Sequence, residues 1–139
     1  MPYKFREDIS IADVAFDASG KNLTELFQSA AEAVIDSMAN TKTIKPLIIK
    51  EIKKHEENVE KLLFEFLEEI IYLKDAESMV FHDIKVKVDE KKMEATAVLR
   101  GDKINPAKQE LHQDVKAVTM HYYKVEKDKI WRTQVVLDI

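Results

Sequence analysis

The sequence predicts an α+β fold in which two amphipathic helices cover a mainly antiparallel sheet, or sheets, built from hairpins. Residues 22–38 and 57–74 carry apolar side chains at intervals of three and four, the period of a helix with one buried face. After residue 79 the apolar side chains instead alternate with polar ones, as in half-buried strands. Strands that follow two helices and are joined by short turns favour this fold class.

Composition sets the limits within which the function must be sought. The 139 residues fit a single domain, 1–139, with one core, and no apolar run approaches the roughly 18 residues of a membrane span. Cysteine is absent, and the amino end lacks the basic and then apolar pattern of a secretory signal, so we expect a soluble, cytoplasmic protein. A net charge of −4 argues against DNA and against general binding to nucleic-acid backbone, although a local basic patch remains compatible.

The first strand and helix are predicted around a short connection. Residues 13–18 alternate, with Val14 and Phe16 facing one way, which indicates a half-buried strand. Asn22 is placed to cap the following helix, and Glu25, three residues later, is placed to reach back to the Asn22 backbone N–H in a capping box. This stripe of the helix is predicted to be core: Leu23, Leu26, Phe27, Ala30, Ala31, Val34, Ile35 and Met38.

The remaining strands are predicted as one isolated strand and two hairpins. A strand is expected near residues 47–53, before the second helix. The first hairpin joins 80–88 to 93–99, and the second joins 115–125 to 130–139 through a charged turn. The segment 101–110 is predicted to be the longer connecting loop.

Acidic groups stand at the start of the first strand and at the end of the last. Asp13 begins one, while Asp138 and the carboxyl of Ile139 finish the other. Were they to meet, three negative charges would converge, at a cost in free energy unless they are protonated or neutralised by a cation. Hard divalent ions such as Ca²⁺ or Mg²⁺ suit such an all-oxygen site. The pattern leaves open the commoner arrangement, a separately solvated carboxylate at each element end.

Histidines and lysines offer weaker candidates. The histidines lack the H-E-x-x-H spacing, so zinc-dependent hydrolysis is not expected. His121 lies in the 115–125 strand, where a hydrogen-bonded structural role is favoured over acid–base chemistry. Lys103, Lys108 and Lys116 could present cations to phosphate, although such lysines are usually only solvated. With two glycines in the chain, a glycine-rich nucleotide loop is excluded.

Three stretches resemble the archease family: DVAFDASGKNLTELFQSAAEAV at 13–34, KLLFEFLEEIIYLKDAE at 61–77, and DVKAVTMHYYKVEKDKIWRTQVVLDI at 114–139. The most specific parts are the VKAVT(M)H strand and the terminal LDI. Archeases are small accessory proteins of the RtcB-type RNA-splicing ligase, which joins RNA ends in tRNA splicing and first attaches GMP to its own histidine. The resemblance implies a non-enzymatic activator that promotes this guanylylation and multiple turnover, with tRNA met only through the ligase.

The resemblance also implies a set of metal ligands. Matched residue by residue, the family's ligands fall on Asp13, Asp138 and Ile139, with Ca²⁺ as the expected ion and Mg²⁺ or Mn²⁺ as alternatives. The early family motif reads approximately Asp-His-Thr-Ala-Asp, whereas residues 9–13 read ISIAD, so its first acid and its histidine are absent. Asp8 is displaced from the acid's position by one residue.

Two other functions remain open on the sequence. A metal-dependent hydrolase or phosphatase could use the same acids, but it would also need a general base, for which His121 or a glutamate is available. An RNA-binding module could use the lysines of residues 103–116, although the acidic balance and the lack of an aromatic-basic motif count against it.

Overall fold

The computed structural model describes residues 2–7 and 13–139. Both predicted helices and both predicted hairpins are present, and a further short strand, β1, opens the chain. The elements in order are β1 (Tyr3–Arg6), β2 (Val14–Gly20), α1 (Leu23–Met38), the 3₁₀ turn η1 (Thr41–Thr43), β3 (Ile48–His55), α2 (Val59–Glu77), β4 (Met79–Asp89), β5 (Glu94–Lys103), β6 (Ala117–Lys127) and β7 (Trp131–Asp138).

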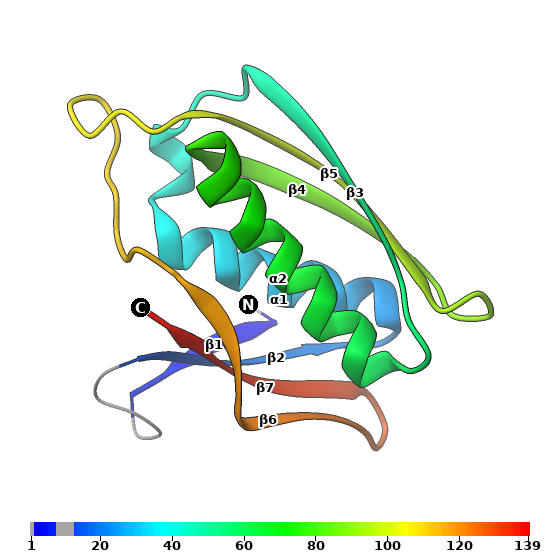
Figure 1. Ribbon diagram of the computed structural model, residues 1–139. Coiled ribbons are helices and arrows are strands. Elements are labelled where there is room, and N and C mark those ends of the chain that lie inside the picture. The colour runs from blue at the N-terminus through cyan, green and yellow to red at the C-terminus, as the bar shows by residue number, and fades with distance from the viewer. Residues whose placement is uncertain (1, 8–12) are drawn as a thin grey trace.

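The elements form three layers, with the two helices between two antiparallel sheets (Figure 1). One sheet has four strands in the order β1-β2-β7-β6, and the other has three in the order β3-β5-β4. Helix α1 contacts β2 and β4, and α2 contacts β3 and β6, so each helix packs on both sheets. The predicted α+β class is therefore confirmed, with the helices filling the middle rather than covering one outer face.

Asparagine caps fix where each helix begins. The Asn22 side chain accepts a hydrogen bond from the Glu25 backbone N–H at 2.9 Å, and Asn58 caps α2 in the same way. The Glu25 carboxylate accepts from the Lys21 backbone N–H at 3.1 Å, one residue before the predicted partner. In the part of the chain that the structure describes, neither helix is long and apolar enough to cross a membrane.

The core lies between the layers and explains why α1 is buried on more than its predicted stripe. Phe27 of α1 and Phe66 of α2 are fully buried, and their rings pack with centroids 5.6 Å apart. Where α1 approaches the sheets it carries small residues such as Ala33, Ser29 and Ser37. Both serine hydroxyls donate to carbonyls of the preceding turn, which satisfies their hydrogen-bonding needs inside the core.

The segment from 104 to 116 connects the three-stranded sheet to the four-stranded sheet and is tied to the ends of both helices. The His112 backbone N–H donates to the Met38 carbonyl at 2.8 Å, at the end of α1. The ammonium of Lys74 on α2 lies 2.7 Å from the carboxylate of Asp114 and 2.8 Å from that of Asp75. The segment that joins the two sheets is therefore fixed to both helices between them.

Candidate functional site

Strands β2 and β7 are the central pair of the four-stranded sheet, and their register brings the predicted acids together. The pairing ends at Val14 opposite Leu137, so Asp13 and Asp138 each lie one residue beyond that pair, on adjacent strands. Leu137 is fully buried against the helices. Because side chains alternate along a strand, Asp13 and Asp138 lie toward the outer face of the sheet, away from the helices.

The last residues of β7 are held by β6 and by the core. The backbone N–H of Lys116 donates to the Asp138 carbonyl at 2.7 Å, and Ala117 pairs with Asp138 in the sheet. The Ile139 side chain is half-buried against the core cluster. Asp138 is exposed, and Asp13 is half-buried. The three positions singled out in the sequence thus lie at one end of one sheet.

Their donor atoms decide which ion these positions suit. Two side-chain carboxylates and a main-chain carboxyl offer only oxygen, the donor of Ca²⁺, Mg²⁺ and Mn²⁺ rather than of zinc. Among residues 2–7 and 13–139 no group of three or more histidine, aspartate or glutamate side chains could hold a metal ion. A cation here would therefore need the Ile139 carboxyl, backbone carbonyls or water beside the two aspartates. Asp8 and residues 9–12 lie outside the described residues.

His121 does not occupy the structural position predicted for it. In the pairing of β6 with β7, Thr119 lies opposite Val136 and Lys124 lies opposite Gln134. Four residues of β6 therefore stand against a single residue of β7. This bulge breaks the alternation and leaves His121 exposed, with its ring 4.2 Å from that of Tyr122. The prediction of a hydrogen-bonded structural histidine in the 115–125 strand was wrong, because alternation of apolar residues does not reveal a bulge.

The lysines of the connecting segment have different surroundings. The Lys103 ammonium donates to the Glu77 carbonyl at 2.6 Å and so satisfies an otherwise unpaired group at the end of α2. The Lys108 backbone N–H donates to the Asn105 carbonyl at 3.0 Å, in a turn eight residues before Lys116. Lys116, exposed and adjacent by hydrogen bond to Asp138, is the one that borders the acidic positions.

Glu68 was not singled out from the sequence. Its carboxylate on α2 accepts a hydrogen bond from the Val118 backbone N–H at 3.0 Å, on the edge strand β6. Burial is the main cause that raises the pKa of Glu68, and the hydrogen bond from Val118 opposes it. Glu68 thus positions the strand segment that pairs with Asp138. A single glutamate on a helix ordinarily indicates a solvated face, so no sequence signal distinguished it.

Comparison with known proteins identifies the family. The family model of the Archease protein family matches residues 3–139. The chain belongs to the archease family. It is 38% identical to the protein archease of Thermococcus kodakarensis over 134 residues, which cover 92% of this chain and 93% of that one. The protein archease of Archaeoglobus fulgidus is 36% identical over 141 residues, with both chains covered completely.

Solved structures of similar proteins carry the archease fold. The solution structure of Methanobacterium thermoautotrophicum protein 1598 matches with a TM-score of 0.81 and 29% identity, covering 99% of each chain. The crystal structure of a Thermotoga maritima archease, described as a possible chaperone, matches with a TM-score of 0.69. It is 23% identical, with 94% of this chain and 93% of that one covered, and therefore supports the fold alone.

Proposed function

We propose that this protein is a non-enzymatic accessory protein that activates an RtcB-type RNA-splicing ligase in the cytoplasm. It would promote guanylylation of the ligase histidine and multiple turnover, and would meet tRNA through the ligase. Membership of the archease family supports this role. The observation that carries the proposal is the β2–β7 register, which places Asp13 beside Asp138 at one end of the sheet.

In this proposal Asp13, Asp138 and the Ile139 carboxyl hold a divalent cation, foremost Ca²⁺, with Mg²⁺ or Mn²⁺ as alternatives. When bound, the cation supplies positive charge that can stabilise a phosphoryl group during transfer. The chain's own contribution is to hold two carboxylates close together at a fixed place. The hydrogen bond from the Lys116 backbone to Asp138 and the packing of Ile139 supply that rigidity.

The test removes the negative charge of one carboxylate while keeping the size of the side chain nearly unchanged. Asp138→Asn and Asp13→Asn should each weaken Ca²⁺ or Mn²⁺ binding in calorimetry, because one charged oxygen ligand is lost in each variant. Asp89→Asn is the matched control, since Asp89 is an exposed aspartate that accepts the Lys92 backbone N–H in a turn of the other sheet. The control should bind the ion as the unmodified protein does.

The second measurement is single-turnover guanylylation of the cognate ligase. The unmodified protein and Asp89→Asn should accelerate guanylylation, and Asp138→Asn should not. Equal acceleration by Asp138→Asn would refute the proposed role of the acids. The purified protein alone should leave phosphoesters unhydrolysed, and turnover of a phosphoester without ligase would instead favour the metal-dependent hydrolase or phosphatase.

A further inference from the structure

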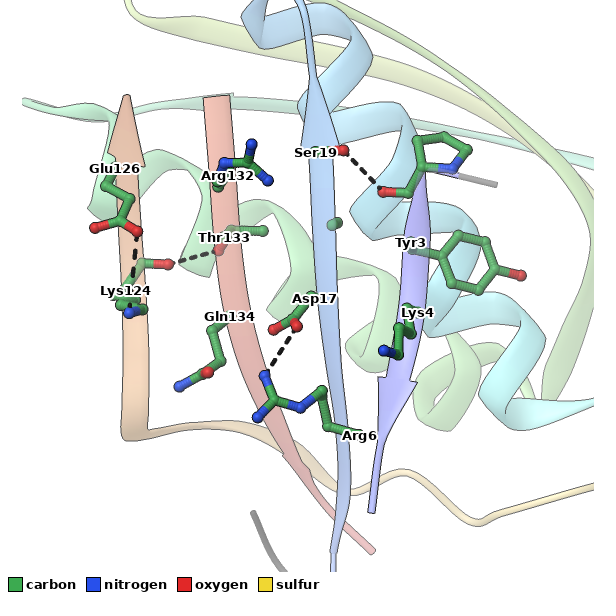
Figure 2. Close-up of a pocket in the computed structure, with 12 residues that line it drawn as sticks. Tyr3, Lys4, Arg6, Asp17, Ser19, Lys124, Glu126, Arg132, Thr133 and Gln134 are labelled. Atoms are coloured by element: carbon green, nitrogen blue, oxygen red, sulfur yellow. Dashed lines mark hydrogen bonds and ion pairs between the residues drawn. The ribbon is translucent and has the colours of Figure 1, made fainter. Parts of the chain in front are cut away.

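A shallow groove of about 290 Å³ crosses the four-stranded sheet on the face away from the helices (Figure 2). One row of residues runs across all four strands in register: Lys4 lies opposite Asp17, Asp17 opposite Gln134, and Gln134 opposite Lys124. The neighbouring row brings Arg132 into the groove. The groove therefore exists only where strands from both ends of the chain lie side by side.

The lining of the groove is positively charged on balance, although the protein as a whole is negatively charged. The chain has a net charge of −4, yet the groove is lined by four cationic side chains and only two acidic ones. Two of the three arginines in the whole sequence are among these residues. The cationic side chains are Lys4, Arg6, Lys124 and Arg132, and the acidic ones are Asp17 and Glu126.

Ion pairs neutralise only part of this positive charge. Arg6 pairs with Asp17 at 2.9 Å, but Lys124 lies 3.9 Å from Glu126. The Arg132 Nε lies 3.4 Å from the Asp128 carboxylate, which is outside the groove lining. All four side chains of these two longer pairs are more than half exposed, and exposed pairs contribute little free energy.

The ammonium of Lys4 and the terminal guanidinium nitrogens of Arg132 have no ion-pair partner in the described part of the chain. Both side chains are exposed. Ammonium and guanidinium donors are thus presented together on one open surface, and the guanidinium fork matches the oxygen geometry of phosphate.

We infer that this groove binds phosphate groups, carried by single-stranded RNA or by a free nucleotide. Its volume is just below the roughly 300 to 1,000 Å³ of sites that enclose a small molecule. The groove therefore suits phosphates that lie across an open surface. The inference goes beyond the proposed function, because it uses none of the acidic positions and needs no metal ion.

Asp13 and Asp138 lie on the same face of the sheet as the groove but some way along the strands from it. Asp138 is four residues beyond Gln134 on β7, which at 3.3 Å per residue is about 13 Å. The buried pair Ala15 and Val136 separates the two regions. A phosphate at the groove is thus well removed from the carboxylates, and a phosphate chain that extends toward Asp138 would approach any cation held there.

The experiment measures binding of two probes to the purified protein. A short, fluorescently labelled oligouridylate is followed by anisotropy, and inorganic tripolyphosphate by its competition with that probe. The double variant Lys4→Gln with Arg132→Gln should weaken oligouridylate binding about tenfold. It should also make the dependence of log affinity on log salt shallower by about 1.4, the value for two lost contacts to a single strand.

The control removes the same charge from the other sheet. Lys85→Gln with Lys87→Gln changes two exposed lysines of β4 and should bind both probes as the unmodified protein does. Competition by tripolyphosphate would indicate that free phosphates suffice, and lack of competition would indicate that an RNA strand is required. Absent binding, equal weakening by the two double variants, or a preference for polyglutamate over both probes would overturn the inference.

Asp138→Asn separates this test from that of the proposed function. The variant should bind the metal ion more weakly and still bind oligouridylate as the unmodified protein does. If the groove variants alone lose the probe, the inference stands whatever the fate of the ligase proposal.

Discussion

The two sheets that enclose the helices are built differently. The three-stranded sheet pairs β4 with its sequence neighbour β5 and shifts register only between Phe81 and Asp83. The four-stranded sheet pairs the first strands of the chain with the last ones and contains the four-residue bulge in β6. The candidate acidic site and the basic groove both lie on this second sheet. Both candidate sites thus lie on the sheet that joins the first strands to the last and that has the larger irregularity in its pairing.

The outer faces of the two sheets also differ in how their charged side chains are placed. On the three-stranded sheet, the exposed residues include the apolar Ile49 and Val98, and a surface hollow is lined by three lysines and one glutamate: Lys53, Lys85, Lys87 and Glu51. Lys53 lies 3.8 Å from the carboxylate of Glu94, which is on the neighbouring strand β5. The four-stranded sheet instead separates positive charge at the groove from negative charge at Asp13 and Asp138. Regions of opposite charge on one face can each attract ions of the opposite sign.

The largest expected effect comes from the chain's two glycines, one in each sheet. A Cβ on Gly101 would lie 2.1 Å from the Val80 carbonyl oxygen, and one on Gly20 would lie 2.3 Å from the Leu26 nitrogen. Gly101→Ala should lower the free energy of unfolding by about 2 to 4 kcal/mol. Gly20→Ala should cost less, because α1 can shift as a unit, whereas the β4–β5 ladder fixes Val80. Urea denaturation measures both.

Thr96→Ala, on the outer face of β5, is the control for this pair and should change the free energy of unfolding by no more than about 1 kcal/mol, because it removes one long hydrogen bond to the Lys87 carbonyl and a β-branched side chain. A larger loss for Gly20→Ala than for Gly101→Ala would show that the four-stranded sheet is the more rigid of the two.

A smaller effect on the free energy of unfolding, dependent on pH, is expected at His112, in the segment that connects the two sheets. The ring nitrogens of His112 lie 2.9 Å from the Asp36 carbonyl and 3.0 Å from the Glu110 carboxylate. The Asp36 contact and then the Glu110 contact raise the pKa of His112 above its ordinary 6.5. The resulting stabilisation is complete below pH 6.5 and is lost as the pH rises through the raised pKa.

The measurement compares the unmodified protein with His112→Gln by urea denaturation on both sides of this range. The difference in free energy of unfolding should be under about 1 kcal/mol, because the contacts are partly exposed, and it should vanish at the alkaline end. A difference that grows with pH would contradict the assignment of His112 as the protonated partner.

The smallest effect tests the bulge in β6. Tyr122 has a left-handed backbone with φ 55°, and Met93, in the β4–β5 turn, has φ 49°. Tyr122→Gly should leave stability unchanged or raise it by up to about 1 kcal/mol, because glycine adopts this conformation without strain and the Tyr122 side chain is exposed. Met93→Gly should destabilise, since Met93 packs against the core. A marked loss for Tyr122→Gly would show that its ring supports the sheet.

The predicted fold was largely right where local pattern decides structure. Both helices follow from apolar side chains at three and four residue intervals, and Asn22 was predicted to cap the first. The second helix was predicted over 57–74 and runs instead from Val59 to Glu77, after a cap by Asn58 that was not predicted. The β4–β5 hairpin follows from alternation and a charged turn. The strand β1 was missed because its four residues are too few to establish a period. The division into two sheets depends on which distant strands pair, and local pattern carries no such information.

The candidate site shows the same limit. Asp13 and Asp138 were chosen for their positions at strand ends and for the family resemblance. They are close together because β2 pairs with β7. The groove was not predicted, because Lys4 and Lys124 stand far apart in the sequence and meet only through four strands in register. The prediction for His121 failed because a bulge shifts the alternation on which it depended.

The pairing of β2 with β7 also sets the order in which the molecule can be completed. Phe16 lies opposite Val135, so β2 has no partner on that side until the ribosome has made the segment more than a hundred residues later that forms β7. Until then the backbone N–H and C=O groups along that edge of β2 lack their strand partner and can pair with other nascent chains. Pairing between segments so distant in the sequence slows folding, so this open edge persists until β7 has reached β2.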